Sequence, residues 1–426
     1  MAQYEPNRLL DLGFKELRET TTLNCQLCGS RDSLFEILDL GHQPICNALL
    51  SSEALNEPEI HYPLKLYVCK NCYLVQLYDV VPASTVFCTG YNYLSGTTQA
   101  LVRYFQSLSG KIVETFDVKP EETVCDIGSN DGTFLRFFKN RNAHVVGIEP
   151  TPLPAKIAID NGIPTVQEFF TEEIGNRFVK DFGKAKVVTA MNVLAHTNKV
   201  HSFLEGVKSL MRQESVFVSQ SHYLPALIEQ LEYDTIYHEH LRYYTLTTLR
   251  RLFQMHGLHV FDAEINDIYG GSILTYCSIK NIEPNKHAKE ILSSETKYQK
   301  LETYIEFANL VRKSARGLGK LLLNLKDQGK RIVGIGAPMK SSTLLNYCHT
   351  GADIIDYLTE VNPLKVGKYS PGVHIPIFNE SILFQAQPDY ALILSWNVAN
   401  DIITELRKKD YSGSFIIPIP EPRIIN

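Results

Sequence analysis

The stretch Thr123–Phe138, TVCDIGSNDGTFLRFF, decides the fold of this chain. It starts as a short β-branched run, passes through the turn-forming residues Gly128, Asn130 and Gly132, and continues with apolar residues at helical spacing. The pattern predicts a strand, a tight loop and a helix. Glycines in such a loop allow backbone N–H groups at the helix start to approach a ligand closely.

A second predicted strand, His144–Ile148, ends in the acidic residue Glu149. A carboxylate at that place can accept hydrogen bonds from both ribose hydroxyls of a nucleoside. A glycine-rich turn alone is equally compatible with an ordinary turn, but strand, helix and acidic residue together predict a nucleoside cofactor. The residues expected to bind it are Asp126, Gly128, Asn130, Gly132 and Glu149.

Length and composition exclude several classes of protein. The 426 residues predict two or three domains with a buried core. With 42 basic and 47 acidic residues and a formal charge of −5, nothing favours binding to nucleic acid or to an acidic membrane. No apolar run reaches transmembrane length, and MAQYEPNRLL lacks a signal-peptide pattern, so we expect a cytoplasmic protein. Nine cysteines, an odd number, argue against a disulfide framework.

Two CxxC pairs stand in the N-terminal region. Their members are Cys25, Cys28, Cys69 and Cys72. Four thiolates in two such pairs can converge on a tetrahedral cation, which predicts a structural zinc ion with no open position for catalysis. Two unrelated reduced pairs or a redox CxxC remain the alternatives. Cys46 and His42 lie between the pairs without CxxC partners, and we leave them out of the metal site.

Strands and helices alternate from Asp117 to Lys280, which predicts a parallel sheet with helices on both faces. Further strands are expected at Gly162–Gln167, Lys186–Met191 and Glu214–Gln220, and a helix at Thr197–Met211.

The end of this alternating region differs from its beginning. The last two predicted strands, Gly257–Glu264 and Ser272–Ile279, leave no room for a crossover helix and should pair as a hairpin. A seven-stranded sheet with an antiparallel final strand resembles the class I S-adenosylmethionine-dependent methyltransferase fold. It does not resemble the all-parallel sheet that binds nicotinamide dinucleotides.

Two phrases are expected at the carboxyl edge of the sheet, where ligands bind. The first, MNVLAHTNKV, contains Asn192 and His196, although this histidine could simply make a structural hydrogen bond at a helix start. The second, LEYDTIYHEHLRYYTLTTLRRLF, contains Tyr237, Glu239 and His240. A histidine beside a tyrosine can remove a proton next to a carbonyl and donate to the developing enolate.

Other interpretations of the second phrase remain open. It is not a zincin helix, because Arg242 stands where HExxH requires histidine. A metal pair of His238 and His240 lacks an evident third ligand, and a purely structural aromatic cluster is the plainest alternative.

The order of these motifs resembles the nucleotide-sugar C-methyltransferases of antibiotic and cell-surface deoxysugar pathways. The resemblance covers roughly Asn24 to Ser395 and includes CxxC…CxxC, DIGSNDG, NVLAH, DTIYHEH, GIGAPMKSSTLLNYC and NPLKVGKYSPGVHIPI. It implies an α/β protein with a zinc domain (1–85), a methyltransferase domain (86–285), and a linking helix with a Rossmann-like nucleotide-sugar domain (286–426). The implied cofactors are S-adenosylmethionine and Zn²⁺.

The implied reaction removes the proton next to the ketone of a nucleotide-linked keto-sugar and methylates the enolate. The usual position is C3 of a 4-keto-6-deoxyhexose, and a dTDP-linked substrate is expected. By resemblance, Tyr237 and His240 transfer the proton, Glu239 orients them, and Asn192 and His196 contact the sugar. We expect His240 as the base and Tyr237 as the carbonyl partner, although the reverse is not excluded. The chain should act as a monomer or homodimer.

The C-terminal third begins with a long helical pattern, Lys286–Asp327, followed by KRIVGIGAPMKSSTLLNY. That phrase predicts a strand, a turn and a helix, and it is not a Walker loop. Lys340 and Ser341 at the helix start, with Lys365 in the next loop, are predicted to bind the diphosphate. A degenerate unit kept only for packing is the alternative.

The chain departs from the family pattern at two places. Relatives often carry His-Gly-Gly-Ser followed by Leu-Arg where this chain has Tyr269–Leu274, and Asp-Arg-Asn-Pro where it has Glu360–Pro363. The base, the stereochemistry and the nucleotide can therefore differ from those of better known members.

Two other functional classes remain. A nucleotide-sugar epimerase or isomerase could use the same tyrosine and histidine without S-adenosylmethionine. A zinc-ribbon binding module with a degenerate methyltransferase body should instead bind a polymer.

Overall fold

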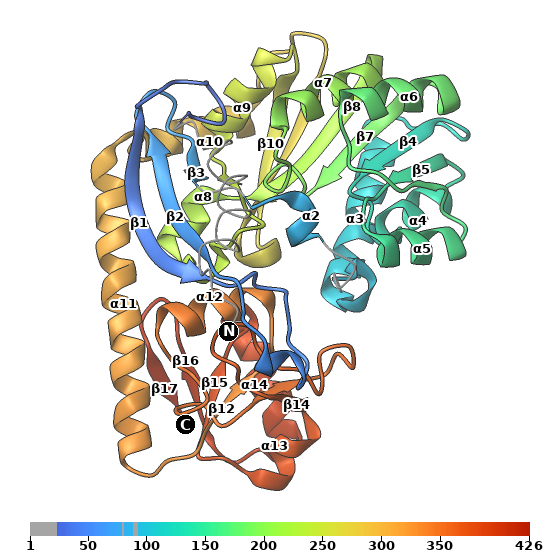
Figure 1. The fold of residues 1–426 in the computed structure, drawn as a ribbon. Coiled ribbons are helices and arrows are strands. Elements are labelled where there is room, and N and C mark those ends of the chain that lie inside the picture. Colours follow the sequence, from blue (N-terminus) through green and yellow to red (C-terminus); the bar gives the residue numbers. More distant parts are fainter. Residues whose placement is uncertain (1–23, 79–80, 88–92) are drawn as a thin grey trace, which may run out of the picture.

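The computed structural model describes residues 24–78, 81–87 and 93–426, so the stretch MAQYEPNRLL and parts of the predicted zinc domain lie outside the described residues. The described chain forms a four-stranded, a seven-stranded and a six-stranded sheet. Figure 1 shows the seven-stranded sheet above the six-stranded one, with the small N-terminal sheet beside both.

The seven-stranded sheet has the order β10-β11-β8-β7-β4-β5-β6. Its strands are β4 (Thr123–Ile127), β5 (His144–Ile148), β6 (Thr165–Val166), β7 (Ala185–Met191), β8 (Met211–His222), β10 (His259–Asn266) and β11 (Ser272–Ser278). β4 runs parallel to β5 and β7, whereas β11 runs antiparallel to both β8 and β10. The predicted terminal hairpin and the predicted class I methyltransferase fold are confirmed.

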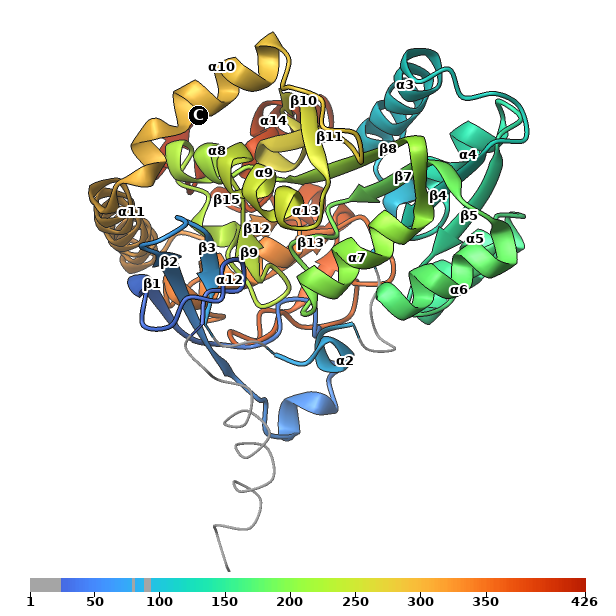
Figure 2. The same ribbon diagram turned by 90° about the horizontal axis from the view of Figure 1, so that it is seen from above.

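Helices cover both faces of this sheet (Figure 2). They are α3 (Gln99–Thr115), α4 (Thr133–Lys139), α5 (Pro152–Asp160), α6 (Glu172–Phe182), α7 (Val200–Leu210) and α9 (Leu246–Met255). The short helix α8 (Leu224–Glu229) packs instead in the apolar cluster of the N-terminal and C-terminal sheets. Alternate strand residues point to opposite faces, so Val124 packs in the cluster of α3 and α4, and Cys125 packs in that of α6, α7 and α9. Edge strand β6 is shorter than the predicted Gly162–Gln167, and α7 is shorter than the predicted Thr197–Met211.

The N-terminal sheet is completed by a strand from the central part of the chain. Its strands are β1 (Leu34–Gln43), β2 (Tyr62–Cys69), β3 (Val75–Leu77) and β9 (Arg242–Tyr243), and a short helix, α2 (Ala83–Val86), follows β3 in sequence. β3 pairs antiparallel with β9, with Gln76 opposite Arg242. The strand that directly follows the YHEH phrase is therefore built into the cysteine-bearing unit.

The predicted long helical pattern Lys286–Asp327 is broken into α10 (Lys286–Ser294) and α11 (Leu301–Asp327) by a short 3₁₀ turn, Glu295–Gln299. Glu295 is buried in that turn, and its carboxylate accepts hydrogen bonds from the backbone N–H groups of Leu246 and Thr247 at the start of α9. Capping α9 in this way fixes the position of the break. α11 then runs alongside the N-terminal sheet and down to the C-terminal unit (Figure 1).

The C-terminal unit is a Rossmann-like sheet of order β14-β13-β12-β15-β16-β17, with β17 antiparallel. Its elements are β12 (Ile332–Ile335), α12 (Met339–Tyr347), β13 (Leu358–Glu360), β14 (Ile377–Asn379), α13 (Ser381–Ala386), β15 (Tyr390–Ile393), α14 (Ala399–Lys408), β16 (Ser414–Ile417) and β17 (Arg423–Ile425). One apolar cluster joins this sheet to α11 and the N-terminal sheet.

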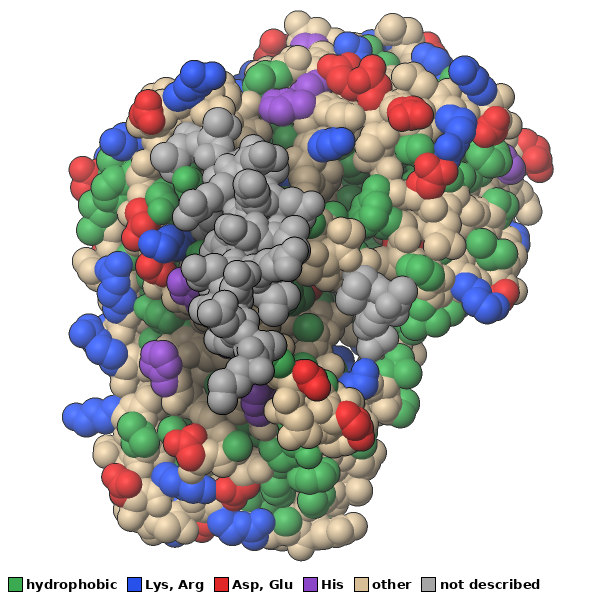
Figure 3. All heavy atoms as spheres, viewed as in Figure 1, with side chains coloured by type: hydrophobic (Ala, Val, Ile, Leu, Met, Phe, Trp, Pro, Cys, Tyr) green, Lys and Arg blue, Asp and Glu red, His purple; other side chains and the backbone are tan. Residues whose placement is uncertain are grey.

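The surface agrees with the balanced composition. Figure 3 shows Lys, Arg, Asp and Glu side chains interspersed over the visible face rather than collected in a stripe of one sign. Among the described residues, no helix combines the length and the apolar character that crossing a membrane requires.

Candidate active site

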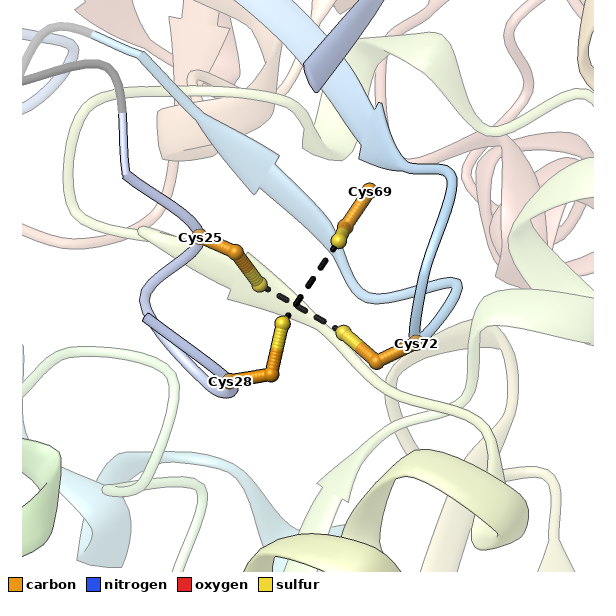
Figure 4. Close-up of side chains that lie close together, drawn as sticks. All are labelled: Cys25, Cys28, Cys69 and Cys72. Atoms are coloured by element: carbon orange, nitrogen blue, oxygen red, sulfur yellow. Dashed lines mark hydrogen bonds between the residues drawn. The ribbon is translucent and has the colours of Figure 1, made fainter. Parts of the chain in front are cut away.

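The two CxxC pairs converge. The ligand atoms of Cys25, Cys28, Cys69 and Cys72 all lie within 4.8 Å of one another. The Cys25 and Cys72 sulfurs are 3.4 Å apart and the Cys28 and Cys69 sulfurs 3.8 Å apart, with all four side chains pointing inward (Figure 4). Tetrahedral zinc at a Zn–S distance of about 2.3 Å places its sulfurs about 3.8 Å apart. The donor set therefore fits a closed Zn²⁺ site.

The glycine loop after β4 has the backbone of a tight ligand-facing turn. Gly128, Asn130 and Gly132 have φ values of 70°, 51° and 75°. A Cβ atom on Gly128 would lie 2.4 Å from Cγ2 of Val193, so glycine is required there. α4 begins directly after the loop, and its first N–H groups face the carboxyl edge of the sheet.

Two buried carboxyl groups flank this loop. Both oxygens of Glu149 accept backbone hydrogen bonds, one from Asn130 at 2.9 Å and one from Thr151 at 2.8 Å. The Thr151 hydroxyl also donates to Oε1, so of the roughly four lone-pair sites of a carboxylate one on Oε2 remains for a ribose hydroxyl. Asp126 accepts a 2.6 Å hydrogen bond from the Thr189 hydroxyl, and burial raises the pKa of Asp126 to about 7. These groups fit a nucleoside cofactor.

A short segment that the sequence patterns did not reveal lies over the glycine loop. The N–H of Ser95 donates to Asn130 Oδ1 at 2.8 Å, and the N–H of Gly96 donates to Asp131 Oδ2 at 2.8 Å. The Asn130 amide also donates to the Tyr93 carbonyl at 3.1 Å. The Asn130 side chain thus holds this segment in place.

The predicted tyrosine and histidine lie together. Tyr237 OH is 3.1 Å from His240 Nε2, and His240 Nδ1 is 2.9 Å from the Thr235 carbonyl. This arrangement assigns Nδ1 as the donor and Nε2 as the acceptor of a neutral ring. Burial, reinforced by the neighbouring His196 and His222, holds the pKa of His240 well below its usual value.

The NVLAH phrase contributes one residue to this cluster. The His196 ring centroid is 4.9 Å from that of His240, and burial lowers the pKa of His196 to about 4. Asn192 follows β7 with φ of 59°, and its backbone N–H donates to the Gln220 carbonyl. No contact joins the Asn192 side chain to the Tyr237–His240 pair within the described residues.

The carboxylate of Glu239 contacts Cys46, a cysteine outside the zinc site. Its Oε1 accepts a hydrogen bond from the thiol of Cys46 at 3.4 Å, and its Oε2 is buried with no partner among the described residues. Burial raises the pKa of Glu239 to about 7. The hydrogen bond of the Glu239 carboxylate thus goes to Cys46. Its expected role in orienting Tyr237 and His240 stays a prediction.

The predicted diphosphate residues separate into two groups. Ser341 and Lys365 line a cleft that also contains Cys46. Lys340 instead lies 3.6 Å from Asp234 Oδ2 and over the Trp396 ring, whose Nε1 donates to the same carboxylate at 2.7 Å. Lys340 thus helps to join the C-terminal unit to the segment that leads to Tyr237.

In the sequence pattern, Arg242 serves only to exclude a zincin motif. It is buried, and it donates to Tyr244 OH, Gln26 Oε1, and the carbonyls of Leu194 and Thr197. Gln26 lies between two zinc-site cysteines, and the two carbonyls flank His196. Arg242 therefore connects the metal site to the histidine cluster.

Comparison with known proteins agrees with this geometry. Family models match residues 25–87 (a zinc binding domain), 99–263 (a methyltransferase domain) and 267–420 (the C-methyltransferase C-terminal domain). The C-methyltransferase NovU of Streptomyces niveus is 33% identical over 407 residues, covering 94% of this chain and 96% of NovU. The chain belongs to the C-methyltransferase family.

Similar solved structures of low identity include two methyltransferases. Magnesium protoporphyrin IX methyltransferase from Synechocystis PCC 6803, with bound SAM, is 13% identical, covering 42% of this chain and 78% of its own with a TM-score of 0.32. An S-adenosylmethionine-dependent methyltransferase from Clostridium acetobutylicum ATCC 824 is 9% identical, covering 42% and 91% with a TM-score of 0.34.

The cofactors of this C-methyltransferase are S-adenosylmethionine and a structural zinc ion, which agree with its methyltransferase fold, its zinc-binding domain and the four converging cysteines. The enzyme methylates carbon, and S-adenosylmethionine supplies the methyl group as an activated sulfonium. Methyl transfer is thereby favoured over an isomerase or epimerase reaction.

Proposed function

We propose that this C-methyltransferase acts on a nucleotide-linked keto-deoxysugar, at the carbon next to the ketone. The preferred substrate is a dTDP-linked 4-keto-6-deoxyhexose methylated at C3. A sugar carbon becomes nucleophilic only after a neighbouring C–H loses its proton, so the enzyme needs a base and a donor to the enolate oxygen.

The observation that carries the proposal is the 3.1 Å hydrogen bond between the buried Tyr237 and the half-buried, neutral His240, which packs against His196. The single O–H proton of Tyr237 is donated to His240 Nε2 here, and with a sugar bound it can turn to the carbonyl oxygen and stabilise the negative charge that develops there. His196 packs against the same ring and is placed to contact the sugar. Asn192, at the end of the neighbouring strand, is proposed to contact it from the sheet edge.

The cleft in the C-terminal unit supports a nucleotide-linked substrate. Near the start of α12, the Ser341 hydroxyl donates to the Pro338 carbonyl at 2.6 Å, and Lys365 Nζ donates to the Ala337 carbonyl at 2.8 Å, 3.6 Å from Glu360 Oε2. A diphosphate would take over these two donors. Cys46 lines this cleft and also contacts Glu239, one residue before His240. A substrate with its diphosphate at Lys365 would therefore extend toward the histidine cluster.

The test compares proton exchange with methylation. Purified enzyme is incubated with a dTDP-4-keto-6-deoxyhexose in deuterated water, with and without S-adenosylmethionine. We expect one methyl group per sugar only when the cofactor is present, and loss of turnover in Tyr237→Phe with cofactor affinity unchanged. Deuterium incorporation with an inverted centre and no methylation would support the epimerase alternative and overturn the proposal.

A further inference from the structure

A second imidazole–carboxylate pair lies beside the proposed reaction site. His222 ends β8, and its Nε2 is 2.7 Å from Oε2 of Glu232. The side chains are 11% and 1% exposed, so the carboxylate is buried while the ring is accessible from one side. Ring nitrogen Nδ1 of His222 has no hydrogen-bond partner among the described residues.

His222 stands at the ligand-binding edge of the sheet. β8 runs parallel to β7, with Met191 opposite Gln220, so His222 projects beyond the same edge that carries Asn192. Its ring centroid is 6.4 Å from that of His240. Three imidazoles, those of His196, His222 and His240, therefore gather around one place.

The three rings differ in their partners. His240 uses one nitrogen with the Thr235 carbonyl and the other with Tyr237. His196 is half-buried, and its buried Nδ1 has no partner in the described part of the chain. Of the three, only His222 is paired with a carboxylate. A carboxylate holds one tautomer of an imidazole and balances the positive charge that the ring gains when it accepts a proton.

The position of Glu232 is tightly defined. A Cβ atom on Gly270 would lie 2.1 Å from Glu232 Oε1, so the carboxylate packs directly against glycine backbone. Gly270 has φ of 91°, a conformation that glycine adopts without strain. The Gln230 amide donates to the Gly270 carbonyl at 2.7 Å and fixes this turn.

We propose that His222 is the general base of the reaction and that Glu232 is its positioning residue; the inference rests on the proposed function. Glu232 accepts the Nε2–H, which leaves the Nδ1 lone pair to take the substrate proton. The C–H bond breaks, the proton moves to Nδ1, and the electron pair forms the enolate double bond while the carbonyl electrons move to oxygen. The Tyr237 hydroxyl then turns its single proton from His240 Nε2 to that oxygen, which reassigns the role expected for His240.

The test isolates proton abstraction from methyl transfer. Enzyme loaded with S-adenosylhomocysteine, which has no methyl group to give, is incubated with dTDP-4-keto-6-deoxyhexose in deuterated water, and exchange at the carbon next to the ketone is followed by NMR. We expect His222→Gln to slow exchange on the order of 100-fold or more, the usual contribution of a positioned base. S-adenosylhomocysteine affinity should stay within about threefold.

Further variants keep the result decisive if His222→Gln loses its fold. His222→Ala should regain exchange when imidazole is added, and Glu232→Gln should lower kcat while leaving KM for the sugar unchanged. The matched control is His256→Gln, because His256 Nδ1 pairs with Glu205 at 2.7 Å between α9 and α7, in the same domain. The control should exchange like the wild type.

Two results would contradict this account, and they can be told apart. Full exchange in His222→Gln, with methylation intact, would overturn the assignment of the base and leave the proposed function standing. A wild-type enzyme that neither exchanges nor methylates a nucleotide-linked keto-sugar would overturn the proposed function and this inference with it.

Discussion

Replacing Arg242 with methionine should weaken both the fold and the reaction. The guanidinium is 2% exposed and donates to four neutral acceptors, among them Gln26 Oε1 at 2.7 Å and the Leu194 carbonyl at 3.1 Å. No carboxylate forms an ion pair with Arg242 in the described part of the chain. Gln26 links Arg242 to the tetrathiolate zinc site, which carries a formal charge of about −2. The zinc site is therefore the negative group near the arginine.

The expected loss of stability follows from the groups left behind. Methionine fills much of the same space, but the Gln26 and Thr197 oxygens would lose a donor inside the protein. The Leu194 carbonyl would keep the hydrogen bond from Tyr244. Gln26 and Thr197 are only partly buried, so two lost hydrogen bonds at about 1–2 kcal/mol each, partly offset by no longer burying a charge, give about 2 kcal/mol.

The assay is urea denaturation of the zinc-loaded enzyme, followed by tryptophan fluorescence and circular dichroism. Arg251→Met is the control, because Arg251 donates to the Asn71 carbonyl at 3.2 Å beside the same zinc site but is exposed. We expect a change of less than about 0.5 kcal/mol for this surface residue. If Arg242→Met cost less than about 1 kcal/mol and released no zinc, the proposed link between the metal site and the histidine cluster would be refuted.

Other substitutions test separate parts of the structure. Gly128→Ala should abolish S-adenosylmethionine binding, since φ is 70° and the new Cβ would clash, whereas Gly329→Ala, at φ of 73° with nothing within 4 Å, should bind the cofactor normally in calorimetry. Cys28→Ser or chelation should release one zinc ion per chain, measured by atomic absorption, and lower the melting temperature; an unchanged melting temperature would rule out a structural role for the metal. Burial raises the pKa of Glu239 to about 7, so this group stabilises the fold below its unfolded pKa and loses that contribution as pH rises toward 7. Glu239→Gln should flatten the fall in stability between about pH 4 and pH 7 in thermal melts, which is the range between the unfolded and the folded pKa. An unaltered pH dependence would count against a buried neutral carboxyl.

Local sequence patterns predicted the elements that local physics determines. The strand, loop and helix around Gly128 follow from β-branched and helical spacing, and the absence of room for a crossover helix predicted the β10–β11 hairpin. The zinc site could be predicted because metal chemistry restricts ligand type and spacing.

Contacts between distant segments could not be predicted in this way. Cys46 and Glu239 form a hydrogen bond although they are 193 residues apart in the sequence, and Arg242 and Gln26 do so although they are 216 residues apart. Neither pairing has a periodic signature, because each depends on how β9 joins the N-terminal sheet. The break in the pattern Lys286–Asp327 was missed for a similar reason, since it depends on Glu295 capping a helix elsewhere in the chain.

The central claim is that this C-methyltransferase transfers the methyl group of S-adenosylmethionine to the carbon next to the ketone of a nucleotide-linked sugar. The most direct measurement uses ¹³C-methyl-labelled S-adenosylmethionine with a dTDP-4-keto-6-deoxyhexose, followed by NMR of the product. We predict a labelled methyl group coupled directly to the C3 carbon, and its loss in Tyr237→Phe. A label on oxygen, or on a carbon that is not adjacent to the ketone, would contradict the account.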